Sequence, residues 1–148
     1  MNNIELIKLD PRAVVPSLQT SGAAGFDLRA CLDEEYIVIK PGQKALIPTG
    51  IAMHIKDPGY AAMILPRSSM GHKRGITLGN TVGLIDSDYQ GELMVSMQNN
   101  SDVDFVIDNM LRIAQLVFVK IGTPVFSIVE DFDNKSVRAA GGFGSTGE

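Results

Sequence analysis

Apolar residues recur at every second position in several short stretches of this 148-residue chain, and this period constrains the fold more than any other feature of the sequence. Side chains two residues apart lie on the same face of a β-strand. Each stretch therefore predicts a strand with one buried face. The alternating apolar sets are Ile51, Met53 and Ile55; Leu93, Val95 and Met97; and Val103, Phe105 and Ile107.

Three further runs are rich in β-branched and aromatic residues: YIVIK at 36–40, RIAQLVFVK at 112–120 and PVFSIV at 124–129. Turn-forming residues separate the runs. They are Pro41-Gly42, Pro48-Thr49-Gly50, Asp57-Pro58-Gly59 and Asn99-Asn100. Many short strands at this spacing predict an all-β sandwich or barrel. We see no internal repeat and no second domain.

Length, composition and net charge further limit the kinds of protein that this chain could be. The chain is long enough for one domain with a real core, and its N-terminus lacks the basic and apolar regions of a signal peptide. No apolar stretch reaches the length of a membrane span. The net charge of −4 argues against a broad nucleic-acid-binding face. We therefore expect a cytoplasmic protein that binds neither membrane nor nucleic acid.

The residues that could bind a transition metal are few. Only His54, His72 and Cys31 could supply nitrogen or sulfur ligands, so a zinc site is not expected. A bound ion would instead be hard and oxygen-ligated, such as Mg²⁺. Cys31 has no partner for an internal disulfide, and we interpret it as a small buried apolar residue.

One segment departs from the strand pattern. PRSSMGHKRG, residues 66–75, predicts one or two helical turns with Ser68 or Ser69 as the N-cap and Gly75 as the stop. Arg67 directly precedes the cap, so the segment could form an anion site. Taken alone, it is equally explained as a capped helix beside a surface arginine, and that simpler interpretation is favoured.

The segment GNTVGLIDSDYQGELM, residues 79–94, predicts a β-hairpin with an acidic tip. Turn propensity explains Ser87 and Asp88. It does not explain why Asp86 directly follows an apolar pair, nor why Tyr89 lies in the tip. A carboxylate at the edge of an apolar strand is a candidate general base.

Polar residues also interrupt two other predicted strands, and the chain ends in a glycine-rich tail. Asp27 lies in AAGFDLRA, and Arg112 and Gln115 lie in RIAQLVF. The tail, RAAGGFGSTGE, places Gly142 and Gly147 at phosphate-loop spacing, but Glu148 stands where that loop needs lysine, so a true P-loop is rejected. The tail is either a flexible end or a flap that closes over a ligand.

In this order, AGFDLRA, PRSSMG, GNTVGLIDSDYQGEL, RIAQLVF and RAAGGFGSTG resemble the five motifs of the homotrimeric dUTPases, the deoxyuridine triphosphate nucleotidohydrolases. The resemblance runs from residue 23 to residue 147. Ala139 departs from the glycine that often follows the tail arginine, and Ser69 departs from the glycine common in the second motif.

The resemblance implies a reaction and a set of site residues. The family hydrolyses dUTP to dUMP and pyrophosphate with Mg²⁺, which keeps uracil out of DNA and supplies dUMP for thymidylate synthesis. Asp86 would activate the water that attacks the α-phosphorus, with Arg138 and Gln115 as further catalytic residues. Asp27 would face the water shell of Mg²⁺. Nucleotide-binding roles fall on Arg67, Ser68, Ser69, Gly71, Asn80, Gly83, Leu84, Ile85, Tyr89, Met94, Phe143, Ser145 and Thr146.

The roles within that set differ. Asn80 and the backbone of 83–86 and Met94 would read uracil and leave no room for a thymine methyl, and Tyr89 would pack on the deoxyribose. Residues 67–71 would hold the β- and γ-phosphates. Phe143 would stack on uracil, and Ser145 and Thr146 would reach the γ-phosphate. Arg112 would have a structural role, tying subunits or motifs together.

The implied fold is a jelly-roll-like β-sandwich or distorted barrel with one short helix and a flexible C-terminal arm. It comprises a domain at 1–136 and a mobile lid at 137–148, in a homotrimer whose active sites are shared between subunits. Two alternatives remain open. One is a related dCTP deaminase, although Ser87 stands where that branch usually has proline. The other is a non-catalytic nucleotide sensor, which would not need Asp86, Arg138 and Phe143.

Overall fold

The computed structural model describes residues 3–134, 136–137 and 139–141, in which ten strands and one helix form. The single helix is α1 (Ser68–Arg74). The strands are β1 (Glu5–Lys8), β2 (Phe26–Arg29), β3 (Tyr36–Ile39), β4 (Lys44–His54), β5 (Tyr60–Leu65), β6 (Ile76–Leu78), β7 (Gly83–Ile85), β8 (Glu92–Asn99), β9 (Phe105–Asp108) and β10 (Arg112–Lys120).

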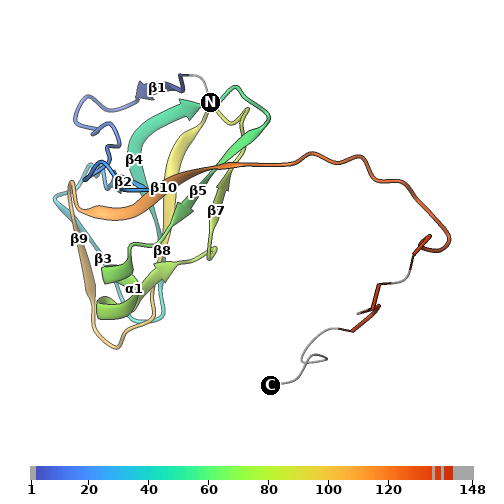
Figure 1. Cartoon of the computed structure of the whole chain (residues 1–148). Coiled ribbons are helices and arrows are strands. Elements are labelled where there is room, and N and C mark those ends of the chain that lie inside the picture. Colours follow the sequence, from blue (N-terminus) through green and yellow to red (C-terminus); the bar gives the residue numbers. More distant parts are fainter. Residues whose placement is uncertain (1–2, 135, 138, 142–148) are drawn as a thin grey trace.

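The strands form two four-stranded sheets and one two-stranded sheet (Figure 1). The first sheet has the order β1-β4-β8-β6, the second has the order β2-β10-β5-β7, and β3 pairs with β9. Every pairing is antiparallel. The all-β prediction is confirmed. In the described part of the chain, no helix has the length and apolar character needed to span a bilayer.

The alternating residues supply much of the core. Leu93, Val95 and Met97 of β8 are all at most 1% exposed, because β8 lies between β4 and β6 and turns one face inward. The third alternating set is only partly right, since Val103 is 64% exposed and precedes β9. Cys31 is buried, as predicted, and its burial raises the pKa of its thiol.

The predicted turns at Pro41-Gly42 and Asp57-Pro58-Gly59 are confirmed, but Asn99 is the last residue of β8 and Pro48–Gly50 is not a turn. It forms a bulge inside β4, where the register with β8 shifts between Pro48 and Ala52. Gly50 has φ +67°, and a Cβ there would lie 2.9 Å from both Ala13 Cβ and Cys31 Sγ, so glycine is required. The Thr49 hydroxyl donates to the Leu93 carbonyl at 2.6 Å, which holds the bulge against β8.

The segment 79–94 also does not form the predicted hairpin, because its two strands do not pair with each other. β7 pairs with β5 in the second sheet, whereas β8 pairs with β4 and β6 in the first. Residues 86–91 therefore connect the two sheets, and we call them the crossing loop. Pairing with β4 and β6 lets β8 bury one apolar face, whereas Leu84 of β7 stays 63% exposed beside β5.

The run at 124–129 does not form the strand that its composition predicts. Residues 122–134 form an extended arm that continues from β10 away from the β-sheets (Figure 1). The described residues include no strand paired with the arm. Its apolar side chains are exposed to solvent in the single chain, and they are Val125, Phe126, Ile128, Val129 and Phe132. A β-branched run needs a partner strand or surface to bury it.

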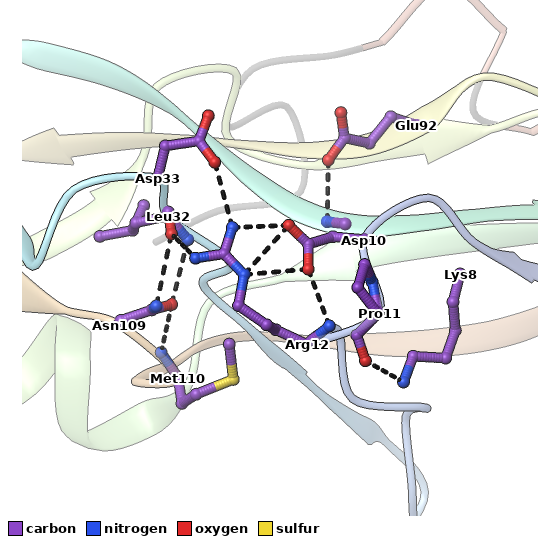
Figure 2. A network of polar contacts seen from close by, with 10 residues as sticks. Lys8, Asp10, Pro11, Arg12, Leu32, Asp33, Glu92, Asn109 and Met110 are labelled. Atoms are coloured by element: carbon purple, nitrogen blue, oxygen red, sulfur yellow. Dashed lines mark hydrogen bonds and ion pairs between the residues drawn. The ribbon is translucent and has the colours of Figure 1, made fainter.

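A polar network centred on Arg12 joins three segments that lie far apart in the sequence (Figure 2). The Arg12 guanidinium contacts Asp10 Oδ2 at 2.6 Å and Asp33 Oδ1 at 3.0 Å, and it donates to the Leu32 carbonyl at 2.9 Å. The Asn109 side-chain carbonyl accepts from the backbone of Leu32 at 3.0 Å. The network holds the segment after β1 against the β2–β3 and β9–β10 connections.

This network predicts how stability depends on pH. Hydrogen bonds from Arg12 lower the pKa of Asp10 from 3.8 to about 2, so the pairing stabilises the fold above pH 3.8 and is lost as the pH falls toward 2. Asp10→Asn should therefore lower the melting temperature near neutral pH and flatten its decline between those values. Thermal unfolding from pH 2 to 7 measures this, with the exposed Asp102→Asn as control. Identical pH profiles for Asp10→Asn and wild type would contradict the assignment.

Candidate active site

Six residues around the crossing loop line a cavity of about 250 Å³. They are Leu84, Ile85, Asp86, Tyr89, Glu92 and Met94. Five of them are predicted site residues, while Glu92 is not. The Asp86 carboxylate is exposed, and none of the described residues donates a hydrogen bond to it. It is therefore available to a ligand or a water molecule.

Tyr89 is held in place within this cavity by its neighbours. Its hydroxyl donates to the backbone carbonyl of Glu92 at 2.9 Å. A Cβ on Gly91 would lie 2.7 Å from Cζ of the tyrosine ring, so only glycine lets the ring lie this close to the backbone. The ring remains 42% exposed and forms part of the cavity wall.

A second cavity, of about 690 Å³, collects the predicted phosphate-site residues. Arg67, Ser68, Ser69 and Gln115 line it together with Asp27. They meet because β10 is the neighbour of both β2 and β5. In the register, Gln115 is opposite Asp27 on one side and opposite Leu65, two residues before Arg67, on the other. Three separate motifs are therefore joined by strand pairing.

Charge in the second cavity centres on Asp27. Its Oδ1 lies 3.1 Å from Nε of Arg67, and its Oδ2 lies 3.1 Å from Nη1 of Arg112. The Asp27 side chain is 11% exposed. Two guanidinium groups face one carboxylate, so the cluster keeps a net positive charge that favours an anionic ligand. Asp27 of the first motif thus connects Arg67 of the second motif with Arg112 of the fourth within one chain.

The side chain of Gln115 is also held in place by a hydrogen bond. Its Nε2 donates to the Pro66 carbonyl at 3.0 Å, which positions the chain just before Arg67. A Cβ on Gly25 would lie 2.7 Å from Gln115 Oε1. The glycine of the first motif therefore makes room for the glutamine of the fourth.

The short helix confirms one prediction and corrects another. α1 ends at Gly75, which has φ +66°, as predicted. The N-cap position is Arg67, without a side-chain capping bond, so Ser68 is the first helical residue instead of a cap. Gly71 lies inside the helix, and its N–H is bonded to the Arg67 carbonyl at 3.3 Å. It does not line the second cavity.

The two cavities share no lining residue. β7 runs antiparallel to β5, with Ile85 opposite Ala62. Asp86 therefore lies beside the first residues of β5, whereas Arg67 follows the last residue of that strand. Along β5 this corresponds to a separation of about 15–20 Å. Asn80 and Gly83 line neither cavity. The predicted residues that line the two cavities therefore fall into two separate groups. We name these groups by the roles predicted for them: the nucleoside half-site at the crossing loop and the phosphate half-site at Arg67.

Four predicted residues, Arg138, Phe143, Ser145 and Thr146, lie outside the described residues. The described residues also contain no group of three His, Cys, Asp or Glu side chains that could hold a metal. Both oxygens of Asp27 are already paired with arginine. The chain thus fits Mg²⁺ only if other oxygens, such as phosphates and water, provide most of its ligands.

Glu92 is the residue of the nucleoside half-site that the sequence did not reveal. Its only signal in the sequence is a charged residue between Gly91 and the buried Leu93. That pattern is common at the start of a strand whose outward positions are polar.

Comparisons with known proteins identify the family of this chain. The dUTPase family profile matches residues 12–147. A deoxyuridine 5'-triphosphate nucleotidohydrolase of Janthinobacterium sp. (strain Marseille) is 59% identical over 150 residues, covering 100% of this chain and 99% of the relative. The protein of that name from Paraburkholderia xenovorans (strain LB400) is 56% identical over 146 residues, covering 99% and 97%.

Solved structures show the same fold. The dUTPase of Staphylococcus bacteriophage 80alpha with dUPNHPP has a TM-score of 0.90 and 28% identity, and each chain is fully covered. A mutant dUTPase from phage phi11 of S. aureus, solved to describe a structural Mg(II) ion, has a TM-score of 0.80 and 26% identity over 90% of this chain and 100% of its own. The family profile matches nearly the whole chain, and relatives of 59% and 56% identity cover almost all of it, so the chain belongs to the dUTPase family.

Proposed function

We propose that this protein hydrolyses dUTP to dUMP and pyrophosphate. The observation that carries the proposal is the pair of half-sites: a small cavity containing a carboxylate and an aromatic ring, and a larger one with excess positive charge. Relatives that match the chain from end to end are named for this reaction. Through it, uracil is kept out of DNA and dUMP becomes available for thymidylate synthesis.

Asp86 acts as the general base in the proposed mechanism. It accepts a proton from water as the water oxygen bonds to the α-phosphorus, and the bond from that phosphorus to the oxygen bridging to the β-phosphate breaks. Pyrophosphate leaves with that oxygen. The carboxylate suits this role because no described side chain or backbone group occupies its oxygens.

The nucleoside half-site accounts for the choice of base and sugar. Uracil would be read by Asn80 and by the backbone around Gly83, Leu84, Ile85 and Met94, with the base held where a thymine methyl has no room. The Tyr89 ring, fixed by the Glu92 carbonyl, would pack on the deoxyribose and exclude a 2′-hydroxyl. A fixed wall excludes an extra atom better than a mobile one does.

The phosphate half-site would bind the β- and γ-phosphates through Arg67, Ser68 and Ser69, with Gln115 beside them. Gly71 would act only through the backbone of α1, since it lies outside this cavity. When bound, Mg²⁺ would neutralise charge on the triphosphate, and Asp27 would contact its water shell.

The separation of the half-sites supports a homotrimer with shared sites. A single chain leaves Asp86 far from Arg67, whereas the half-sites of two neighbouring chains can face each other across an interface. The exposed apolar arm at 122–134 supports assembly, because such a segment needs another surface to cover it. The lid at 137–148, with Arg138, Phe143, Ser145 and Thr146, remains part of this proposal.

Replacing the proposed general base, Asp86, should greatly reduce turnover without abolishing nucleotide binding. Asp86→Asn keeps the size of the side chain but removes its basicity, so kcat should fall by about 10³-fold while affinity for a non-hydrolysable dUTP analogue changes little. Pyrophosphate release and analogue titration measure the two effects. Near-normal turnover in this variant would exclude Asp86 as the base.

Moving the tyrosine ring should weaken sugar selection. Gly91→Ala places a methyl group against the Tyr89 ring, so the ring must shift. We expect the dUTP/UTP ratio of kcat/KM to fall by about tenfold. Gly22→Ala is the matched control, because nothing lies within 4 Å of a Cβ at Gly22. If Gly91→Ala leaves the dUTP/UTP ratio of kcat/KM unchanged, the Tyr89 ring is not what selects the sugar.

Shared sites can be tested by mixing two inactive variants. Asp86→Asn lacks the base and Arg67→Gln lacks a phosphate ligand, so each alone should be inactive. In trimers reassembled at random from equal amounts, about a quarter of the interfaces would combine an intact Asp86 with an intact Arg67. Activity should rise to that fraction of wild type. If both residues acted from the same chain, no mixture would recover activity.

A further inference from the structure

Glu92 lies beside the proposed base and sugar-binding ring, yet the proposed mechanism assigns it no role. It lines the 250 Å³ cavity with Asp86 and Tyr89. Its side-chain Oε1 accepts the Gly50 N–H at 2.8 Å, and its backbone carbonyl accepts the Tyr89 hydroxyl at 2.9 Å. In Figure 2 a dashed line joins the Glu92 carboxylate to this backbone nitrogen of β4, close to the labelled Asp10.

The donor to Glu92 is itself fixed by the core. Gly50 lies in the β4 bulge, packed against Ala13 and Cys31 with no space for a side chain. Its carbonyl accepts the N–H of Leu9 at 2.8 Å and that of Asp10 at 3.3 Å. Asp10 is held in turn by Arg12. The Glu92 carboxylate is therefore bonded to one of the most constrained backbone positions in the described structure.

We propose that Glu92 is a positioning residue for the nucleoside half-site. By accepting the Gly50 N–H, its side chain fixes the backbone carbonyl that holds the Tyr89 hydroxyl, and so fixes the wall that faces the sugar. This inference rests on the proposed function, because it gives Glu92 a role only if Tyr89 selects deoxyribose.

The contacts of Glu92 indicate that geometry, not charge, is what matters. Among the described residues, no lysine, arginine or histidine forms an ion pair with Glu92, and its hydrogen-bond donor is a neutral backbone N–H. A glutamine side chain offers the same acceptor oxygen. The conservative change should therefore preserve the function, whereas truncation should not.

The other end of the crossing loop is held independently. The Ser87 carbonyl accepts the Lys56 N–H at 3.0 Å, a contact that involves neither Tyr89 nor Glu92. Loss of the hydrogen bond between Glu92 and Gly50 should thus leave Asp86 near its position, while the Tyr89 ring becomes less fixed. The effect should appear in KM and in sugar selectivity more than in kcat.

The experiment compares Glu92→Ala with Glu92→Gln in steady-state assays of dUTP and UTP. Glu92→Ala should raise KM for dUTP by about tenfold and lower the dUTP/UTP ratio of kcat/KM by a similar factor, with kcat within about twofold of wild type. Glu92→Gln should match wild type. Asn100→Ala is the control, since it removes a side-chain hydrogen bond to Thr77 just beyond the other end of β8.

Other outcomes would overturn the inference. Wild-type kinetics in Glu92→Ala, or equal impairment in both Glu92 variants, would show that the side chain does not act as a positioning acceptor. If Glu92→Ala fails to fold, Tyr89→Phe provides a second test, because it removes the hydrogen bond from the Tyr89 hydroxyl to the Glu92 carbonyl. An unchanged dUTP/UTP ratio of kcat/KM in Tyr89→Phe would also overturn the inference. A wild-type protein that releases no pyrophosphate from dUTP would instead refute the proposed function itself.

Discussion

The position of β10 between β2 and β5 is the constraint on which the phosphate half-site depends. Antiparallel pairing on both sides brings Asp27, Gln115 and the end of β5 together. The Asp27 carboxylate then lies between the guanidinium groups of Arg67 and Arg112. Without Asp27 the two cations would repel each other, and without them a mostly buried carboxylate would be costly. The cluster both orders three motifs and leaves a positive charge for an anion.

The nucleoside half-site depends on a different part of the fold, the connection between the sheets. β7 belongs to one sheet and β8 to the other, so the crossing loop spans the edge of the molecule and is held from both sides. The β4 bulge makes this possible, because Thr49 and Gly50 direct hydrogen-bonding groups toward β8. The β4 bulge is thereby bonded to Glu92, the first residue of β8 after the crossing loop.

The sequence predicted strands and motifs well where the signal is local. Period-two alternation located β8 and the last part of β4, and Gly75 marked the end of α1. Predictions failed where pairing decides the outcome. The 79–94 segment looks like a hairpin, but its strands pair elsewhere, and Pro48–Gly50 looks like a turn but is a bulge. The 124–129 run looks like a strand, yet a single chain offers it no described partner.

The sequence by itself determined the family, the order of the motifs and the chemical types at the site, because these are carried by residue identity and spacing. Only the tertiary structure decided that the cavity-lining residues divide into two groups, that Asp27 is paired with two arginines, and that the Glu92 carbonyl accepts the Tyr89 hydroxyl. These features arise from contacts between residues as many as 85 positions apart. Such contacts are set by strand order and register, which local patterns do not encode.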